Sequence, residues 1–147
     1  MPKASAAARR RAPSRTNGPD EVADGVFVGG WKDAEKFEGA RLCVLDEAPE
    51  GMAGITHVTI YDTDADRADL PNLDRVAEGV RAARARGEKV LVFCGQGVRR
   101  SPLAAAWYLH RSEGLTLDQA YERIRGVRPQ IEPAAAWIGD TTNLDAE

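Results

Sequence analysis

One stretch decides the fold of this chain: Val90-Leu91-Val92-Phe93-Cys94-Gly95-Gln96-Gly97-Val98-Arg99-Arg100-Ser101-Pro102. Its first four residues form a wholly apolar run, which is typical of a buried parallel strand. The run delivers Cys94 to the carboxyl end of that strand. After a loop with two glycines, Ser101-Pro102 begins a helix, since proline is tolerated in a first turn. Ligands bind at the carboxyl ends of strands in open α/β sheets, so we expect the chemistry in this loop.

Strand-like runs alternate with helical stretches along the rest of the chain. Strands are expected at 26–28, 42–45, 58–61 and 90–93. Helices are expected from Leu73 until Gly87, from Ser101 until Gly114, from Thr116 until Gly126 and from Pro133 through Ile138. The alternation favours an α/β fold with a mostly parallel central sheet of about four to five strands flanked by helices.

Length and composition narrow the class of protein. The chain has 147 residues, 43% apolar and 29% charged, which suits one globular domain and excludes collagen, a coiled coil and wholly disordered chains. No apolar run approaches the roughly 20 residues of a membrane helix, and no secretory signal is present, so we expect no membrane partner. Two cysteines and two histidines cannot form a disulfide scaffold or a four-ligand His/Cys zinc site. We expect a cytoplasmic monomer without metal or cofactor.

The N-terminus differs from the rest of the chain. Residues 1–19 hold five basic side chains and no acid, and their charge of +5 leaves −8 on residues 20–147. We therefore expect a disordered basic tail over residues 1–20 and a single domain over 21–147. Contact of the tail with nucleic acid or an acidic partner is the alternative to a solvated tail. The acidic domain itself makes nucleic-acid binding a poor expectation.

The loop is suited to hold a phosphate. Its successive amides can converge on one anion, and the following helix N-terminus adds partial positive charge. Arg100 can grip two phosphate oxygens in bidentate fashion. The same surroundings favour ionisation of the Cys94 thiol, which would then be an in-line nucleophile, with Ser101 donating to the sulfur. The alternatives are a nucleotide-binding turn and a merely buried cysteine, which is our interpretation of Cys43.

The segment from Cys94 to Ser101 resembles the Cys-x5-Arg-Ser/Thr signature of the cysteine-dependent protein phosphatases, and the chain from about Val26 resembles their compact dual-specificity branch. Further similarity lies in the Asp62 segment and in Ala120 to Pro129. The resemblance implies a phosphocysteine intermediate on Cys94. It implies phosphate binding by a set of loop residues: Gly95, Gln96, Gly97, Val98, Arg99 and Arg100.

The resemblance also implies an aspartate general acid about thirty residues upstream of the cysteine, after an apolar strand. Asp62 fits best, and Asp64 and Asp66 are its rivals. The reaction then needs Cys94 ionised and Asp62 protonated, so we expect a bell-shaped pH profile on the acidic side of neutrality. We expect vanadate to inhibit the reaction and metal chelators not to inhibit it. A merely solvated acidic loop is the alternative for this segment.

Several neighbouring residues carry secondary expectations. The family usually has histidine before the cysteine, where this chain has Phe93, and this departure bears on turnover near neutral pH. Arg99 either makes the pocket rim more cationic or pairs with an aspartate of residues 62–69. Arg128 is expected to order neighbouring loops, and a Cys43–Cys94 disulfide is left open. The three tryptophans are expected in the core: Trp31, Trp107 and Trp137.

Together these features predict a protein phosphatase acting on phosphotyrosine, with phosphoserine or phosphothreonine as further substrates implied by the resemblance. Its partner would be a phosphorylated protein. A phosphoinositide or RNA 5′-phosphatase with the same chemistry is one alternative, which only the extra charge of Arg99 favours. A weakly active, phosphate-binding pseudophosphatase is another, favoured by Phe93 and opposed by the intact Cys94, Arg100 and Ser101.

Overall fold

The computed structural model describes residues 18–138, so most of the expected N-terminal tail, residues 1–17, lies outside the described residues. The elements are β1 (Asp20–Ala23), β2 (Val26–Gly30), α2 (Trp31–Lys36), β3 (Ala40–Cys43), β4 (Thr56–His57), β5 (Tyr61–Asp62), β6 (Arg67–Ala68), α3 (Leu70–Ala85), β7 (Val90–Cys94), α4 (Arg100–Glu113), α5 (Leu117–Val127) and the 3-10 turn η1 (Ala135–Trp137). Asp20 begins β1 and is buried, so this one residue of the expected tail belongs to the sheet.

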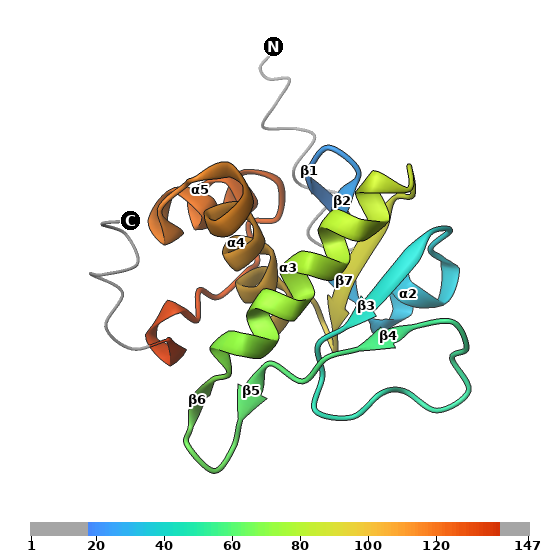
Figure 1. Ribbon diagram of the computed structural model, residues 1–147, viewed down its shortest axis with the longest axis horizontal. Coiled ribbons are helices and arrows are strands. Elements are labelled where there is room, and N and C mark those ends of the chain that lie inside the picture. The colour runs from blue at the N-terminus through green and yellow to red at the C-terminus, as the bar shows by residue number, and fades with distance from the viewer. Residues whose placement is uncertain (1–17, 139–147) are drawn as a thin grey trace.

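The central sheet has five strands in the order β1-β2-β7-β3-β4 (Figure 1). β7 pairs in parallel with β2 and β3, β3 pairs in parallel with β4, and only β1 is antiparallel. All five residues of β7 are buried, as its uninterrupted apolar run requires of a central parallel strand. The expected mostly parallel α/β sheet is therefore confirmed.

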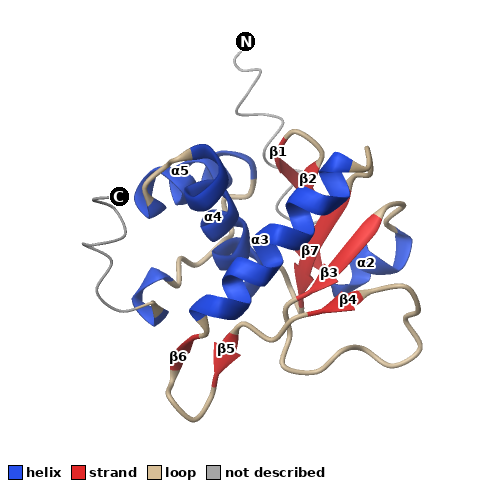
Figure 2. Cartoon of the chain, in the orientation of Figure 1, coloured by secondary structure: helices blue, strands red, loops and turns tan. Residues whose placement is uncertain are grey.

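Helices cover both faces of this sheet (Figure 2). α3, α4 and α5 pack on one face over Val90, Val92 and Cys94, and α2 packs on the other over Leu91 and Phe93. Successive side chains of a strand point to opposite faces, so Phe93 and Cys94 diverge. Cys43 lies beside Phe93 on the α2 face, and both cysteines are free. A Cys43–Cys94 disulfide would have to cross the sheet.

The helix boundaries follow local signals. Asp69 caps α3 by accepting a hydrogen bond from the Asn72 amide at 3.0 Å, and Gly87, with φ 82°, follows its end. Gly114 ends α4 in the left-handed conformation. Thr116 and Gln119 form the expected capping box at the start of α5. Gly126 does not end α5, which continues through Val127.

The strand expected over residues 58–61 is wrong. After β4 the chain leaves the sheet, because other groups occupy its carbonyls: the Asn72 side chain donates to Thr59 O and the Asp69 amide donates to Ile60 O, both at 2.8 Å. Tyr61 and Asp62 instead pair with β6 in a separate two-stranded ribbon. This ribbon projects from the lower edge of the domain in Figure 1.

The last expected helix is reduced to the 3-10 turn η1. The Ala134 amide donates to the hydroxyl of Tyr121 at 3.1 Å, which ties the segment before the turn to α5. Among the tryptophans, Trp107 is fully buried as expected, Trp137 is only half-buried, and Trp31 is 42% exposed. The expectation of a core position is thus wrong for Trp31, because the six residues of α2 bury only Ala34.

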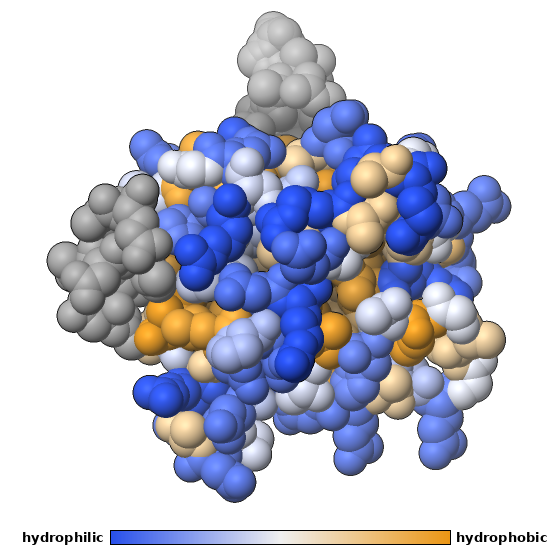
Figure 3. Space-filling model, in the orientation of Figure 1, coloured by the Kyte–Doolittle hydropathy of each residue, from blue (hydrophilic) through white to orange (hydrophobic). Residues whose placement is uncertain are grey.

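The face drawn in Figure 3 is mostly hydrophilic, with small separate apolar areas. Within residues 18–138, no helix is long and apolar enough to cross a bilayer. In the same part of the chain no cluster of three or more His, Cys, Asp or Glu side chains could hold a metal ion.

Candidate active site

The candidate site lies where β7 ends and α4 begins. Cys94 is the last residue of β7, and α4 starts six residues later at Arg100. The loop between them is anchored to the neighbouring strand, because the Trp31 amide donates to Gly95 O at 3.1 Å directly after β2. In the first turn of α4 the Ser101 amide donates to Cys94 Sγ, the Leu103 amide donates to Arg99 O, and Pro102 has no N–H, which leaves the Arg100 amide at the helix start for an anion.

Three donors surround the sulfur of Cys94. The Gly97 amide lies 3.3 Å from Sγ, the Ser101 amide 3.4 Å, and the Ser101 hydroxyl 3.3 Å. This set matches a thiolate, which only accepts hydrogen bonds. The side chain is 5% exposed, so the sulfur is almost buried at the bottom of the loop.

The Ser101 hydroxyl has two acceptors and one proton. Its Oγ lies 3.3 Å from Sγ and 3.2 Å from Gly29 O. When the sulfur carries a proton, the thiol can donate to Oγ while the hydroxyl donates to the carbonyl. When the sulfur is ionised, the hydroxyl can turn and donate to it. The position suits the role expected of Ser101, which is to steady the thiolate.

Arg128 holds the loop from behind. Its Nε donates to Gly97 O at 2.8 Å, and a terminal nitrogen donates to Gln96 O at 3.1 Å. The carbonyl and the following amide of a trans peptide point in opposite directions. Drawing Gln96 O outward therefore turns the Gly97 amide inward, to the sulfur. Arg128 orders the loop, as the sequence analysis expects.

Arg128 is in turn fixed by the first strand. It donates to the Asp20 carboxylate at 2.7 Å, and both residues are buried. Burial raises the pKa of Asp20, and the hydrogen bond and charge of Arg128 oppose that rise. β1 thus contributes a structural counter-charge to the site, although it lies at the edge of the sheet.

The loop opens into a cavity of about 300 Å³, lined by Leu45, Cys94, Gly95, Gln96, Val98, Arg99, Arg100, Glu132 and Trp137. The sequence-predicted Cys94, Arg100 and most of the phosphate-binding loop therefore meet at one hollow. The sulfur faces a space of a size that admits a phosphate group.

Arg100 lies on one side of this cavity. Its guanidinium carbon is 5.5 Å from the ring centre of Tyr61 and 6.0 Å from that of Trp137, and a terminal nitrogen lies 3.4 Å from Asp46 Oδ2. Its Nε is buried and has no hydrogen-bond partner in the structure. An unpaired buried donor is costly, so this nitrogen is available for an incoming oxyanion.

The structure does not bring Asp62 into the cavity. Its Oδ1 accepts hydrogen bonds from the amides of Asp64 and Ala65, at 3.0 and 3.2 Å, and its side chain is exposed. Its neighbour Tyr61 faces the site instead, and its ring packs against that of Trp137 with centres 4.6 Å apart and planes tilted by 50°. The hydroxyl of Tyr61 donates to Asp66, and this hydrogen bond raises the pKa of Tyr61.

Arg99 pairs with Glu132 at 2.6 Å, and not with an aspartate of residues 62–69. Both alternatives considered for Arg99 overlooked this partner, which lies 33 residues further along the chain. The pairing partly neutralises the extra charge at the rim.

Sequence analysis missed Asp46, Tyr61, Glu132 and Trp137 as site residues. The position of Asp46 could have been predicted from the sequence. It follows β3, which is a parallel neighbour of β7, and the carboxyl ends of parallel strands lie at the same edge of a sheet. The other three carried no such signal, because the ribbon, the 3-10 turn and the segment before that turn, which holds Glu132, reach the site through tertiary packing.

Comparison with known proteins agrees with this geometry. The family model described as "Dual specificity phosphatase, catalytic domain" matches residues 45–143. Dual specificity protein phosphatase 12 of Rattus norvegicus is 32% identical over 124 residues, which cover 76% of this chain and 37% of that protein. Dual specificity phosphatase 28 of Mus musculus is also 32% identical over 124 residues, which cover 76% of this chain and 74% of that protein.

A solved structure shows the same architecture. The crystal structure of human DUSP28 superposes with a TM-score of 0.71 at 25% identity, over 87% of this chain and 93% of that one. The match to the rat protein spans little more than a third of its length. The family model nevertheless covers more than half of this chain, including the cysteine loop. The chain belongs to the dual specificity phosphatase catalytic-domain family.

Proposed function

We propose that this protein is a cysteine-dependent protein phosphatase that hydrolyses phosphotyrosine, and also phosphoserine and phosphothreonine, in phosphorylated proteins. The observation that supports it most is the position of Cys94 Sγ beside a cavity of about 300 Å³, which admits a phosphate group, and within 3.4 Å of three donors. Family membership supports the same chemistry.

In the first step the phosphate enters the loop and meets its amides and Arg100. The unpaired Nε and a terminal nitrogen of Arg100 offer the two parallel donors of a bidentate grip. The thiolate of Cys94 attacks phosphorus, a sulfur–phosphorus bond forms, and the ester oxygen–phosphorus bond breaks. The leaving oxygen takes a proton from a general acid.

In the second step water attacks the phosphorus of phosphocysteine. The sulfur–phosphorus bond breaks, the sulfur leaves as a thiolate, and the product is inorganic phosphate. The carboxylate formed in the first step accepts the proton from the attacking water. The amides of the loop and Ser101 stabilise the same sulfur as nucleophile and as leaving group.

Asp62 is our proposal for the general acid. Its ribbon already touches the site through Tyr61 and Trp137, so a turn of the ribbon on substrate binding would bring its carboxyl toward the leaving oxygen. Asp46 is closer to the cavity, but its carboxylate is directed at Arg100, on the phosphate side of the reaction.

Protein substrates are favoured over phosphoinositides and RNA 5′-phosphates. Those polyanionic substrates need an unusually basic pocket, and only Arg99 suggested one. Its charge is paired with Glu132, and Asp46 adds a carboxylate beside Arg100. The rim is therefore not rich in uncompensated positive charge.

The first test replaces the nucleophile. Cys94→Ser should abolish turnover of para-nitrophenyl phosphate and of a phosphotyrosine peptide, because serine cannot supply a thiolate, while the variant still binds the peptide. Ser112→Ala, at an exposed serine of α4, is the matched control and should keep full activity. A wild-type protein that binds the peptide without turnover, and is unchanged by Cys94→Ser, would be a pseudophosphatase.

The second test concerns the general acid. Asp62→Asn should slow hydrolysis of a phosphotyrosine peptide by about 10²-fold, because its leaving group needs a proton. Para-nitrophenyl phosphate has a better leaving group and should be slowed much less. Asp64→Asn is the control. Equal loss in both variants would refute the assignment of Asp62 and leave the role of Cys94 intact.

A further inference from the structure

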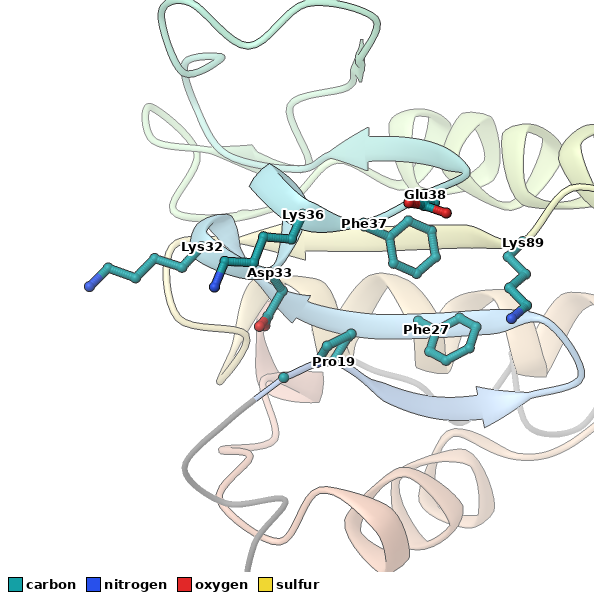
Figure 4. Close-up of a pocket in the computed structure, with 9 residues that line it drawn as sticks. Pro19, Phe27, Lys32, Asp33, Lys36, Phe37, Glu38 and Lys89 are labelled. Carbon is teal, nitrogen blue, oxygen red and sulfur yellow. The ribbon is translucent and has the colours of Figure 1, made fainter.

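A second cavity lies on the α2 face of the sheet, away from the sulfur of Cys94. It has a volume of about 580 Å³ and is bounded by α2, the outer side of β2 and the residue preceding β7 (Figure 4). None of the cysteine-loop residues lines it. The proposed phosphatase chemistry therefore gives this cavity no role.

The floor of the cavity is aromatic. The rings of Phe27 and Phe37 meet edge to face with centres 5.4 Å apart, and both side chains are half-buried. Pro19 flanks the rings in Figure 4. Binding of an apolar side chain over these rings would remove apolar surface from water, which is favourable.

The rim of the cavity collects one type of cation. Residues 18–138 contain three lysines, Lys32, Lys36 and Lys89, and all three line this cavity. Figure 4 shows Lys32 and Lys36 toward one end and Lys89 toward the other, with the phenylalanine rings between them. Two acidic residues, Asp33 and Glu38, also line the cavity, so its lining has a net charge of +1, whereas residues 18–138 together carry −5.

These lysines have no ion-pair partner among the described residues, whereas eight arginines of the same part of the chain are paired with acids. Lys89 only lies 6.0 Å from the ring centre of Phe27. The nearby Asp33 carboxylate accepts from the Gly30 amide at 2.9 Å, so it is occupied within its own helix start.

We propose that this groove docks an acidic peptide segment of a partner protein, with an apolar residue of the peptide on Phe27 and Phe37 and its carboxylates facing the three lysines. The spacing of the lysines around an apolar floor suits alternating acidic and apolar side chains. A nucleic acid fits less well, because it presents no apolar side chain to the two phenylalanine rings. The proposal does not depend on the phosphatase activity.

The test measures the fluorescence anisotropy of a labelled peptide of about twelve residues, rich in glutamate around a central Leu-Phe pair. The triple variant K32Q/K36Q/K89Q should bind it at least about ten-fold more weakly than the wild type. The control R81Q/R86Q/R123Q removes the same charge from α3, from the residue that follows α3 and from α5, and should bind normally. Equal weakening of peptide binding in both variants would overturn the proposal, since it would show that binding depends on the overall charge of the protein and not on this groove.

Two further arms examine the floor and the ligand class. A peptide with Ser-Ser in place of Leu-Phe should bind about ten-fold more weakly, because it leaves the rings uncovered. Oligothymidylate of the same charge should bind more weakly than the peptide. Tighter binding of the oligonucleotide, lost in the lysine variant, would overturn the proposal in favour of nucleic acid. Para-nitrophenyl phosphate turnover should be unchanged in the lysine variant, so failure of docking is distinguishable from failure of catalysis.

Discussion

Individual side chains at the site carry opposing charges. Arg100 faces the cavity that we assign to the phosphate, yet Asp46 lies 3.4 Å from one of its terminal nitrogens. An incoming phosphate must share the guanidinium with this carboxylate and is repelled by it. Asp46 therefore weakens oxyanion binding at the same time as it holds the arginine in place.

Replacing Asp46 should make the pocket bind oxyanions more tightly. A carboxylate at this range and 45% exposed contributes about 1 kcal/mol of repulsion, so Asp46→Asn should lower the inhibition constant of vanadate about five-fold. Glu78→Gln is the control, because Glu78 pairs with Arg81 and does not line this cavity. An unchanged or higher constant in Asp46→Asn would show that Asp46 serves only to position the arginine.

At the scale of elements, the geometry of the loop depends on close approach of two backbones. Gly97 has φ 71°, and a Cβ there would lie 2.6 Å from the carbonyl carbon of Gly29 and 2.6 Å from a terminal nitrogen of Arg128. β2 and the buttressing arginine thus leave no room for any side chain at this position.

Gly97→Ala should move the loop and disable the site. The left-handed conformation costs alanine about 1 kcal/mol, and crowding against a fixed backbone adds to that, so we expect a loss of at least about 2 kcal/mol in stability and ten-fold in kcat/KM. In Gly114→Ala the alanine must adopt a similar left-handed conformation, at φ 73°, but no atom lies within 4 Å of its Cβ. This variant should lose about 1 kcal/mol and keep its kcat/KM. Equal kcat/KM in the two variants would contradict the proposed crowding.

At the scale of the whole molecule, α5 is joined to the segment that carries Trp137. The Tyr121 hydroxyl accepts from the Ala134 amide at 3.1 Å, and burial raises the pKa of Tyr121 to about 12. The unfolded chain ionises this phenol near pH 10, so the neutral form is favoured by folding. Its contribution is fully present below pH 10 and is lost as the pH rises toward 12.

This linkage predicts a steep alkaline loss of stability. Wild-type protein should lose about 3 kcal/mol of unfolding free energy between pH 10 and 12 from this residue. Tyr121→Phe should be about 1 kcal/mol less stable at pH 7, because the Ala134 amide loses its acceptor, but should lack this part of the alkaline loss. Urea titrations across this pH range measure both effects. An identical alkaline slope in the variant would refute the role of Tyr121.

The sequence by itself determined the three central strands β2, β3 and β7 and the reactive loop. An apolar run, a cysteine, two glycines and a helix start are local features, and each acts on its neighbours in the chain. The position of Arg128 behind the loop was also predictable in part, since its segment resembles a known family.

Only the tertiary structure decided which distant groups meet this loop. Asp46 and Trp137 come from opposite halves of the chain and reach Arg100 through strand order and packing. Asp62 lies outside the cavity for the same reason: the hydrogen bonds of Asn72 and Asp69 remove residues 59–60 from the sheet and start a ribbon that turns Tyr61 to the site. Short-range propensity specifies elements, whereas contacts between elements depend on burial and hydrogen bonding that form only when the whole chain has folded.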